Sequence, residues 1–153
     1  MLASQSNLAS TYQLLGRDEA LTMRRTVYCG SLKLFGEDHS NTLTKAHNYA
    51  LCLIHLKRFE EAKEELRKMM HVARRVLGET NDITLGMRDS YAMALYRDAS
   101  ATLDDLREAA TTLEEIASTA RRVFGRRHPD TEVIECHLRK ARAALRARET
   151  GSA

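Results

Sequence analysis

Residues 74–78 have the sequence RRVLG, and a closely similar ending occurs three times in the chain. It recurs as LKLFG at residues 32–36 and as RRVFG at residues 121–125. The three glycines lie 42 and then 47 residues apart. A near-constant period of this size indicates a repeat architecture, in which each structural unit stacks only on its neighbours.

Two further markers occur once in each unit, in the same order. The first is a segment that ends in a small Ala, at residues 7–9, 48–50 and 90–92. The second is a Glu-Ala pair, at residues 19–20, 61–62 and 108–109. The first unit lacks one residue before this pair, and the third has five extra residues between its helices. Because these differences fall in turns, they leave the helical faces in register.

The apolar residues within each unit follow a helical period. In the second unit Leu43, Ala46, Ala50 and Leu53 recur at steps of three and four residues, which is the spacing of one helix face. A single Pro and many good helix formers favour long helices. We therefore predict seven helices, at about residues 2–15, 18–35, 41–57, 60–77, 83–99, 103–124 and 130–148.

The predicted fold is an all-α, right-handed α-solenoid of three helical hairpins with a C-terminal capping helix. It forms a single domain over residues 1–149, followed by a tail at 150–153. The hairpins cover about residues 2–36, 41–78 and 83–125, and the capping helix covers 130–148. A small residue stands where the two helices of each hairpin must approach closely, at Ala9, Ala50 and Ala92.

Helix ends are marked by capping residues and by Gly. The linkers at residues 38–40, 81–82 and 128–130 hold Ser, Asn and Asp, which can accept the unpaired N–H groups of a helix start. We expect His39 and His128, in the same linkers, to make loop-to-helix hydrogen bonds. The sequence from Thr102 to Asp105 resembles a capping box. The left-handed conformation that closes a helix is open to Gly36, Gly78 and Gly125.

Together these markers resemble tetratricopeptide repeats, specifically the roughly 42-residue kinesin light chain type. The resemblance rests on the turn KRFEEA at residues 57–62 and on the linkers FGEDHS at 35–40 and FGRRHP at 124–129. It covers about residues 2–148. It implies a protein-binding module with a concave groove, lined by the first helix of each hairpin, that takes an extended or helical peptide.

In that family, an Asn one turn before the small Ala often bonds the peptide backbone. The corresponding positions here are Ser6, His47 and Asp89, whereas Asn7 and Asn48 come one residue later. These positions lie outside the apolar face of their own hairpin, so we expect that packing does not need them and that they line the groove. The alternative is that they form a solvated helix surface that binds no ligand. Helical spacing gives the groove candidates Ser6, Ser10, Gln13, Thr44, His47, Leu51, His55, Asp89, Met93, Tyr96 and Arg97.

Charge is unevenly distributed along the chain. Residues 1–120 carry 15 Lys or Arg and 17 Asp or Glu, whereas residues 121–148 carry 9 and 3, a net charge of +6. This basic end could meet phosphates or anionic lipid, but it lacks aromatic residues for stacking on bases. A polar cap on the stack is the alternative. Its cations are Arg121, Arg122, Arg126, Arg127, Arg139, Lys140, Arg142, Arg146 and Arg148.

Patterns of catalysis and metal binding are missing from the sequence. There is no GxSxG, HExxH or Gly-rich phosphate loop. His47 and His55 stand about 12 Å apart along a helix, too far to share one zinc ion, and His71 and His137 have no partner at a telling spacing. We therefore predict no enzyme activity, no cofactor and no metal.

The sequence also predicts where the chain is found. Cys29, Cys52 and Cys136 form no CxxC pair and are expected to be reduced thiols. No apolar run reaches about 18 residues, and the residues after Met1 lack the regions of a secretory signal. We expect an intracellular, cytoplasmic protein.

Three functions follow from these observations. The first is a protein-interaction module that binds a peptide or helix of another protein in the groove. The second is a structural subunit, or a piece of a longer repeat array, buried in a larger assembly. The third, less favoured, is binding of nucleic acid or an anionic surface through residues 121–148.

Overall fold

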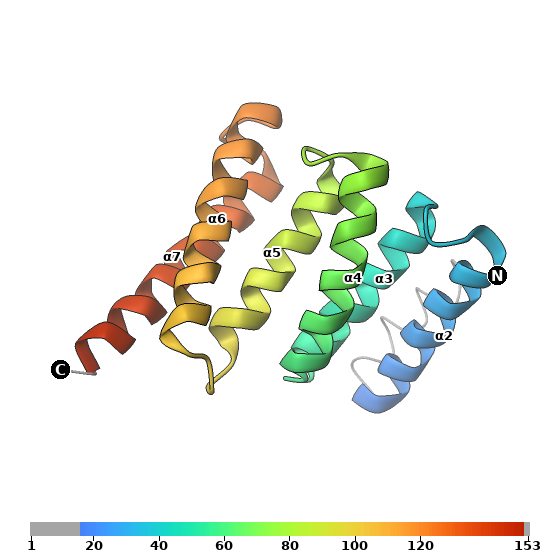
Figure 1. Ribbon diagram of the computed structural model, residues 1–153, viewed down its shortest axis with the longest axis horizontal. Helices are drawn as coiled ribbons and strands as arrows, with labels where there is room; N and C mark the ends of the chain where they lie inside the picture. The colour runs from blue at the N-terminus through green and yellow to red at the C-terminus, as the bar shows by residue number, and fades with distance from the viewer. Residues whose placement is uncertain (1–15, 152–153) are drawn as a thin grey trace.

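The computed structural model describes residues 16–151, which form six helices and no strand. The sequence predicted seven helices, and the first of these, at residues 2–15, lies outside the described residues. The capping helix extends three residues beyond its predicted end. The helices are α2 (Arg17–Phe35), α3 (Ser40–His55), α4 (Phe59–Leu77), α5 (Asp82–Arg97), α6 (Leu103–Val123) and α7 (Pro129–Gly151) (Figure 1).

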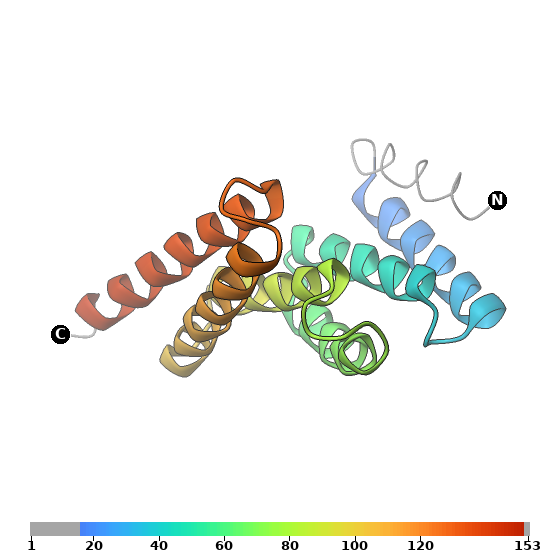
Figure 2. The same cartoon turned by 90° about the horizontal axis from the view of Figure 1, so that it is seen from above.

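These helices stack as layers that curve. Each helix packs on the next in the chain, and in addition α3 packs on α5 and α5 on α7. The backbones of α2, α4 and α6 do not come close to one another. Consequently α3, α5 and α7 form an inner wall, and α4 and α6 lie on the outer side of the stack (Figure 2).

The small residues predicted at the helix contacts are buried. Ala50 and Ala92 are 1% and 0% exposed, and both belong to the hydrophobic core. Ala9, the third predicted position, lies outside the described residues. Large apolar side chains such as Leu53 and Leu95 complete the same layers at 1% exposure each. Ala50 and Ala92 therefore lie in the core, as positions of close helix contact must.

A fourth repeat marker was missed in the sequence. Thr42, Thr84 and Thr131 stand at the starts of α3, α5 and α7, and each is 0% exposed. Their spacings of 42 and 47 residues match those of the glycines. The hydroxyl of Thr42 donates to the carbonyl of Ser31 at 3.2 Å, which ties the start of α3 to the preceding helix. Because Thr is polar, apolar periodicity does not reveal this buried position.

Helix starts follow the prediction closely. The Nδ1 atoms of His39 and His128 accept hydrogen bonds from the backbone N–H two residues on, at 3.1 and 3.2 Å. Each imidazole also stacks on the preceding Phe35 or Phe124, with ring centroids 4.8 and 4.9 Å apart. The capping box at Thr102 is present, with both of its hydrogen bonds. These capping predictions are confirmed.

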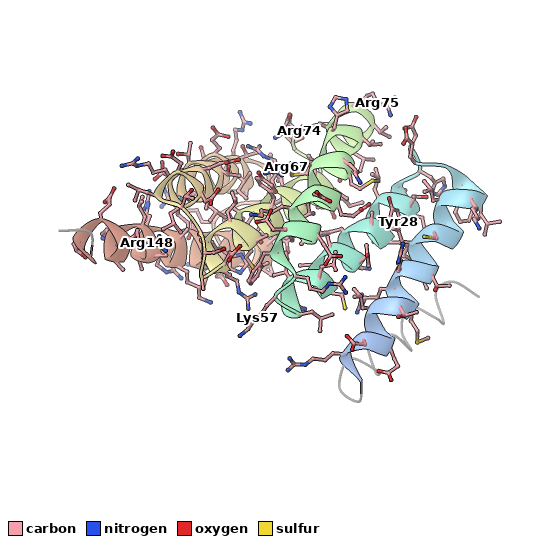
Figure 3. The ribbon with its side chains drawn as sticks, turned by 60° about the horizontal axis from the view of Figure 1, so that its bottom comes forward. Tyr28, Lys57, Arg67, Arg74, Arg75 and Arg148 are labelled. Atoms are coloured by element: carbon pink, nitrogen blue, oxygen red, sulfur yellow. The ribbon has the colours of Figure 1, made fainter. Side chains whose placement is uncertain are left out.

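Helix ends differ from the prediction in one detail. Gly36 and Gly78 have the expected positive φ of 81° and 88°, but their ψ of 173° and 168° places them in an extended region open essentially to Gly alone. At the end of α3, Lys57 (Figure 3) has φ 60°. Hydrogen bonds from Lys57 to Ile54 and from Arg58 to Leu53 close this helix at 3.0 and 2.9 Å.

The described helices carry many charged residues. None of those between residues 16 and 151 combines the length and the apolar character that crossing a bilayer requires.

Candidate functional site: the inner wall

Polar side chains on the inner wall connect one layer to the next. The Nε2 atom of His47 on α3 lies 2.7 Å from the hydroxyl of Ser90 on α5. In the following layer, Nδ1 of His137 on α7 lies 2.8 and 2.9 Å from the two carboxylate oxygens of Asp89 on α5. The two contacts are equivalent. Asp89 occupies in α5 the position that His47 occupies in α3, 42 residues earlier. Each of the two side chains contacts the residue that follows its own repeat-equivalent position on the next inner helix.

This arrangement corrects one expectation. We expected that packing would not need His47 and Asp89, and this expectation is wrong. His137, which has no partner at a telling spacing in the sequence, contacts Asp89 from 48 residues away. Asp89 is 7% exposed, and the side chain of His137 is 16% exposed. Buried carboxylates require hydrogen-bond donors, so the wall needs this pair for its own stability. The partners are 43 and 48 residues apart, a separation that no local spacing reveals.

The imidazole of His47 is held in a tight, largely dry position. A Cβ atom on Gly86 would lie 3.0 Å from its Cε1, so Gly is needed there to make room for the ring. Burial lowers the pKa of His47 below its usual value, against the opposing influence of Asp89 and of a hydrogen bond with the Gly86 backbone. The ring is therefore neutral at physiological pH.

Stability is expected to fall on acidification because of this histidine. Above the pKa of an unfolded His, about 6.5, both states are neutral; below it, the unfolded chain takes up a proton that the folded chain resists. The free energy of unfolding, measured by urea titration between about pH 7.5 and 5.5, should decrease by up to about 1.4 kcal/mol per pH unit for this group. His47→Asn should reduce that slope. An unchanged slope in the variant would contradict the assignment.

A cleft of about 250 Å³ opens on the inner wall between α5 and α7, beside His47. Its apolar lining includes Ile83 and Val133, and Val133 is 49% exposed. The exposed carboxylates of Asp82 and Asp130 also line it. The sequence analysis missed all four residues, because the N-terminal ends of two different helices must meet before they form one site.

The opposite end of the wall is cationic. His55 and Arg97, at the ends of α3 and α5, are both exposed. Burial lowers the pKa of His55, and the positive charges of Arg97 and Arg24 lower it further, which shows that the three groups lie near one another. The wall therefore changes from carboxylates at the cleft to cations at its other end.

The remaining groove candidates are distributed over the same wall. Thr44 donates its hydroxyl to the carbonyl of Ser40 at 3.0 Å. Leu51 and Met93 are half-buried. Tyr96 packs against the core, and burial raises its pKa to about 12. The candidates from the first predicted helix, Ser6, Ser10 and Gln13, lie outside the described residues.

The basic end of the chain is partly neutralised by the fold. Arg121 pairs with Glu135 at 2.5 Å, and Arg142 pairs with Glu114 at 2.7 Å. Arg148 (Figure 3) donates to a carbonyl in the α5–α6 linker at 2.8 Å. Among the cations of this basic end, six form no ion pair with residues 16–151: Arg122, Arg126, Arg127, Arg139, Lys140 and Arg146.

Between residues 16 and 151, no three His, Cys, Asp or Glu side chains are placed to hold a metal ion. The three cysteines are free, with Cys29 exposed and Cys52 buried. What the inner wall offers is thus a surface for contact: an acidic cleft, half-buried apolar side chains and a cationic end.

The family model of the tetratricopeptide repeat matches residues 1–67. Within this stretch the chain is similar to tetratricopeptide repeats. No curated protein sequence matches the chain.

Solved tetratricopeptide-like repeats share this fold. One is a structure of TPR-like repeats, nearly identical to one another, from a Podosopora anserina protein assigned as a kinesin light chain. It superimposes with a TM-score of 0.81 at 23% identity, over 94% of this chain and 66% of that chain. A single-substitution variant of that protein gives 0.75 at 22% identity, over 99% and 69%. BtubC (BKLC) from P. vanneervenii gives 0.69 at 18% identity, over 99% and 63%.

The resemblance to the kinesin light chain type of repeat is confirmed at the level of fold. The chain spans about two thirds of the length of these solved tetratricopeptide structures. At such identities the likeness concerns the stacking of helices. The inner wall of this chain must therefore be judged from its own side chains.

Proposed function

We propose that this chain is a non-catalytic interaction module that binds an extended or helical segment of another protein on its inner wall. Tetratricopeptide repeats generally mediate contacts between proteins. The observation that carries the proposal here is the cleft, where Val133 stays 49% exposed between the carboxylates of Asp82 and Asp130. An apolar surface with polar surroundings is the usual composition of a protein-binding site.

The charges of the wall give the bound segment a direction. A cationic side chain of the partner would point toward Asp82 and Asp130, and an acidic one toward Arg97. Apolar side chains between them would cover Leu51 and Met93. Complementary charges at the ends favour one orientation and speed association, while apolar contacts supply most of the affinity. We expect a dissociation constant of about micromolar, because so few layers offer limited area.

A matched pair of variants tests this proposal in affinity capture from a native extract. The wall variant carries Leu51→Glu and Arg97→Glu. The control carries Lys68→Glu and Thr111→Glu, two exposed positions on α4 and α6 with the same total change in charge. Quantitative mass spectrometry should show that proteins retained by the unmodified chain are lost at least about tenfold with the wall variant and kept with the control.

Folding must be verified alongside capture, because Leu51 is half-buried. Far-UV circular dichroism and thermal unfolding of both variants provide this check. If the folded wall variant captures the same proteins as the unmodified chain, the inner wall is not the binding surface.

A further inference from the structure

The outer side of the stack carries a second, larger groove. It lies between α2 and α4, has a volume of about 680 Å³, and is called here the α2–α4 groove. Tyr49 of α3 forms its floor, between side chains of the two outer helices. The residues that matter for its chemistry are Arg25, Cys29, Lys33, Tyr49, Arg58 and Glu61.

The floor of this groove is firmly supported. Tyr49 stacks on Tyr28, with ring centroids 6.2 Å apart and an interplanar angle of 24°. Tyr28 (Figure 3) crosses from α2 to α4, where its hydroxyl lies 3.4 Å from Glu65 and 3.3 Å from the sulfur of Met69. Tyr49 itself makes no hydrogen bond within residues 16–151.

A groove of the same construction occurs one repeat later. The α4–α6 groove, of about 360 Å³, has Tyr91 on its floor, 42 residues after Tyr49. Each groove combines an Arg of its first outer helix, a Tyr of the inner helix and a Glu of its second outer helix. The sets are Arg25, Tyr49 and Glu61 in one, and Arg67, Tyr91 and Glu108 in the other.

The cations of the α4–α6 groove are satisfied by the protein itself. Arg67 donates to the hydroxyl of Tyr91 at 3.2 Å and lies 5.3 Å from the centre of its ring, and that hydroxyl donates to Glu108 at 3.2 Å. Arg74 pairs with a glutamate of the α4–α5 linker at 3.1 Å, and Arg88 with one on α6 at 2.7 Å. Figure 3 shows Arg67 and Arg74 along α4.

The α2–α4 groove lacks this compensation. Arg58 is held by Glu61 through two hydrogen bonds of 2.7 and 2.6 Å. Arg25 and Lys33, both exposed, make no hydrogen bond or ion pair within residues 16–151. Residues 1–15 contain no Asp or Glu that could pair with them. The same arrangement of side chains is thus compensated internally in one repeat, whereas in the other two cations form no ion pair with residues 16–151.

We propose that the α2–α4 groove binds an acidic segment of a partner protein, independently of the inner wall. Arg25 and Lys33 are eight residues apart on α2, which places them about 12 Å apart along the helix. In an extended peptide, side chains four residues apart lie on one face at about 13 Å. Two carboxylates at that spacing reach both cations, and the side chain between them lies over Tyr49.

This geometry favours a peptide over other anions. A single phosphate cannot span about 12 Å, so it would engage only one of the two cations. A nucleic acid would carry its charge along the whole groove, where it meets Glu61 in the lining and the carboxylate of Asp18, which lies near Arg58. Burial raises the pKa of Tyr49, so its hydroxyl keeps the proton that it can donate to a carboxylate.

The test is a titration of the full chain, labelled with ¹⁵N, at low salt. The probe is a nine-residue Gly/Ser peptide with Glu at its third and seventh positions and Phe between them; its counterpart has Gln in place of Glu. We expect amide shifts around Arg25, Lys33 and Tyr49, and affinity at least about tenfold weaker for the Gln peptide. The Arg25→Gln, Lys33→Gln variant should also lose at least about tenfold, and added salt should weaken binding.

The α4–α6 groove supplies the matched control, because Arg67→Gln changes the equivalent Arg there and should leave affinity within about twofold. The proposal fails if the acidic peptide does not bind, or if Arg67→Gln weakens it as much as the double variant. It also fails if the shifts map to the inner wall. Inorganic phosphate or a single-stranded oligonucleotide binding more tightly through Arg25 and Lys33 would replace the acidic peptide as ligand.

Discussion

Replacing His137 by Leu is expected to lower the free energy of unfolding by about 3 kcal/mol. The substitution keeps an apolar body of similar size on α7 but removes the donor that lies 2.8 and 2.9 Å from the carboxylate of Asp89. A carboxylate that is 7% exposed is then left buried without its partner, and breaking a buried pair in this way is strongly destabilising. Urea unfolding at neutral pH measures the loss.

The pair can be separated from other effects of the substitution. Adding Asp89→Leu to His137→Leu removes the stranded charge, so the double variant should recover to within about 1 kcal/mol of the original stability. His71→Leu, at an exposed histidine of α4, should change stability by less than about 0.5 kcal/mol. Amide exchange should speed up mainly in α7. A double variant as unstable as the single one would contradict the role given to Asp89.

A comparable loss, of about 2–3 kcal/mol, is expected from Ala92→Leu. Ala92 is 0% exposed in the core where α5 packs on α6, and extra methylene groups there force the helices apart or into strained rotamers. Ala50→Leu, at the equivalent position of α3, should cost a similar amount. Thermal or urea unfolding of both variants provides the measurement.

The exposed Ala143 on α7 is the matched control for these substitutions. Ala143→Leu should leave stability within about 0.5 kcal/mol, because no neighbouring helix meets the added side chain. Equal losses at positions 50 and 92 would support their equivalence in successive layers. If Ala92→Leu proved neutral, the helices would not be closely packed there.

The architecture was predictable because its signals are local. Apolar residues at three- and four-residue steps define helix faces, and Gly36, Gly78 and Gly125 end helices with the positive φ that Gly tolerates. His39 and His128 cap helices through atoms two residues away. The buried position of Thr42 escaped notice, since polarity alone does not show that its hydroxyl is satisfied by a carbonyl of the preceding helix.

The candidate sites were predicted less well, because they depend on how layers turn relative to one another. Helical spacing placed His47 and Asp89 on the inner wall but could not show that each would contact the next layer. The two outer grooves have the same residues at repeat spacing, yet only contacts between helices show that Arg67 is compensated and Arg25 is not.

The amino-acid sequence by itself determined the helices, their ends, the period of the stack and the small residues at Ala50 and Ala92, because each depends on neighbours within a few turns. Only the tertiary structure decided which end of the inner wall is acidic, which histidine contacts a buried carboxylate, and which outer groove has cations without an ion pair among residues 16–151. Those properties arise between side chains on different helices, which are up to 48 residues apart in the sequence. Their contacts are set by the rotation and spacing of packed layers, which no local pattern encodes.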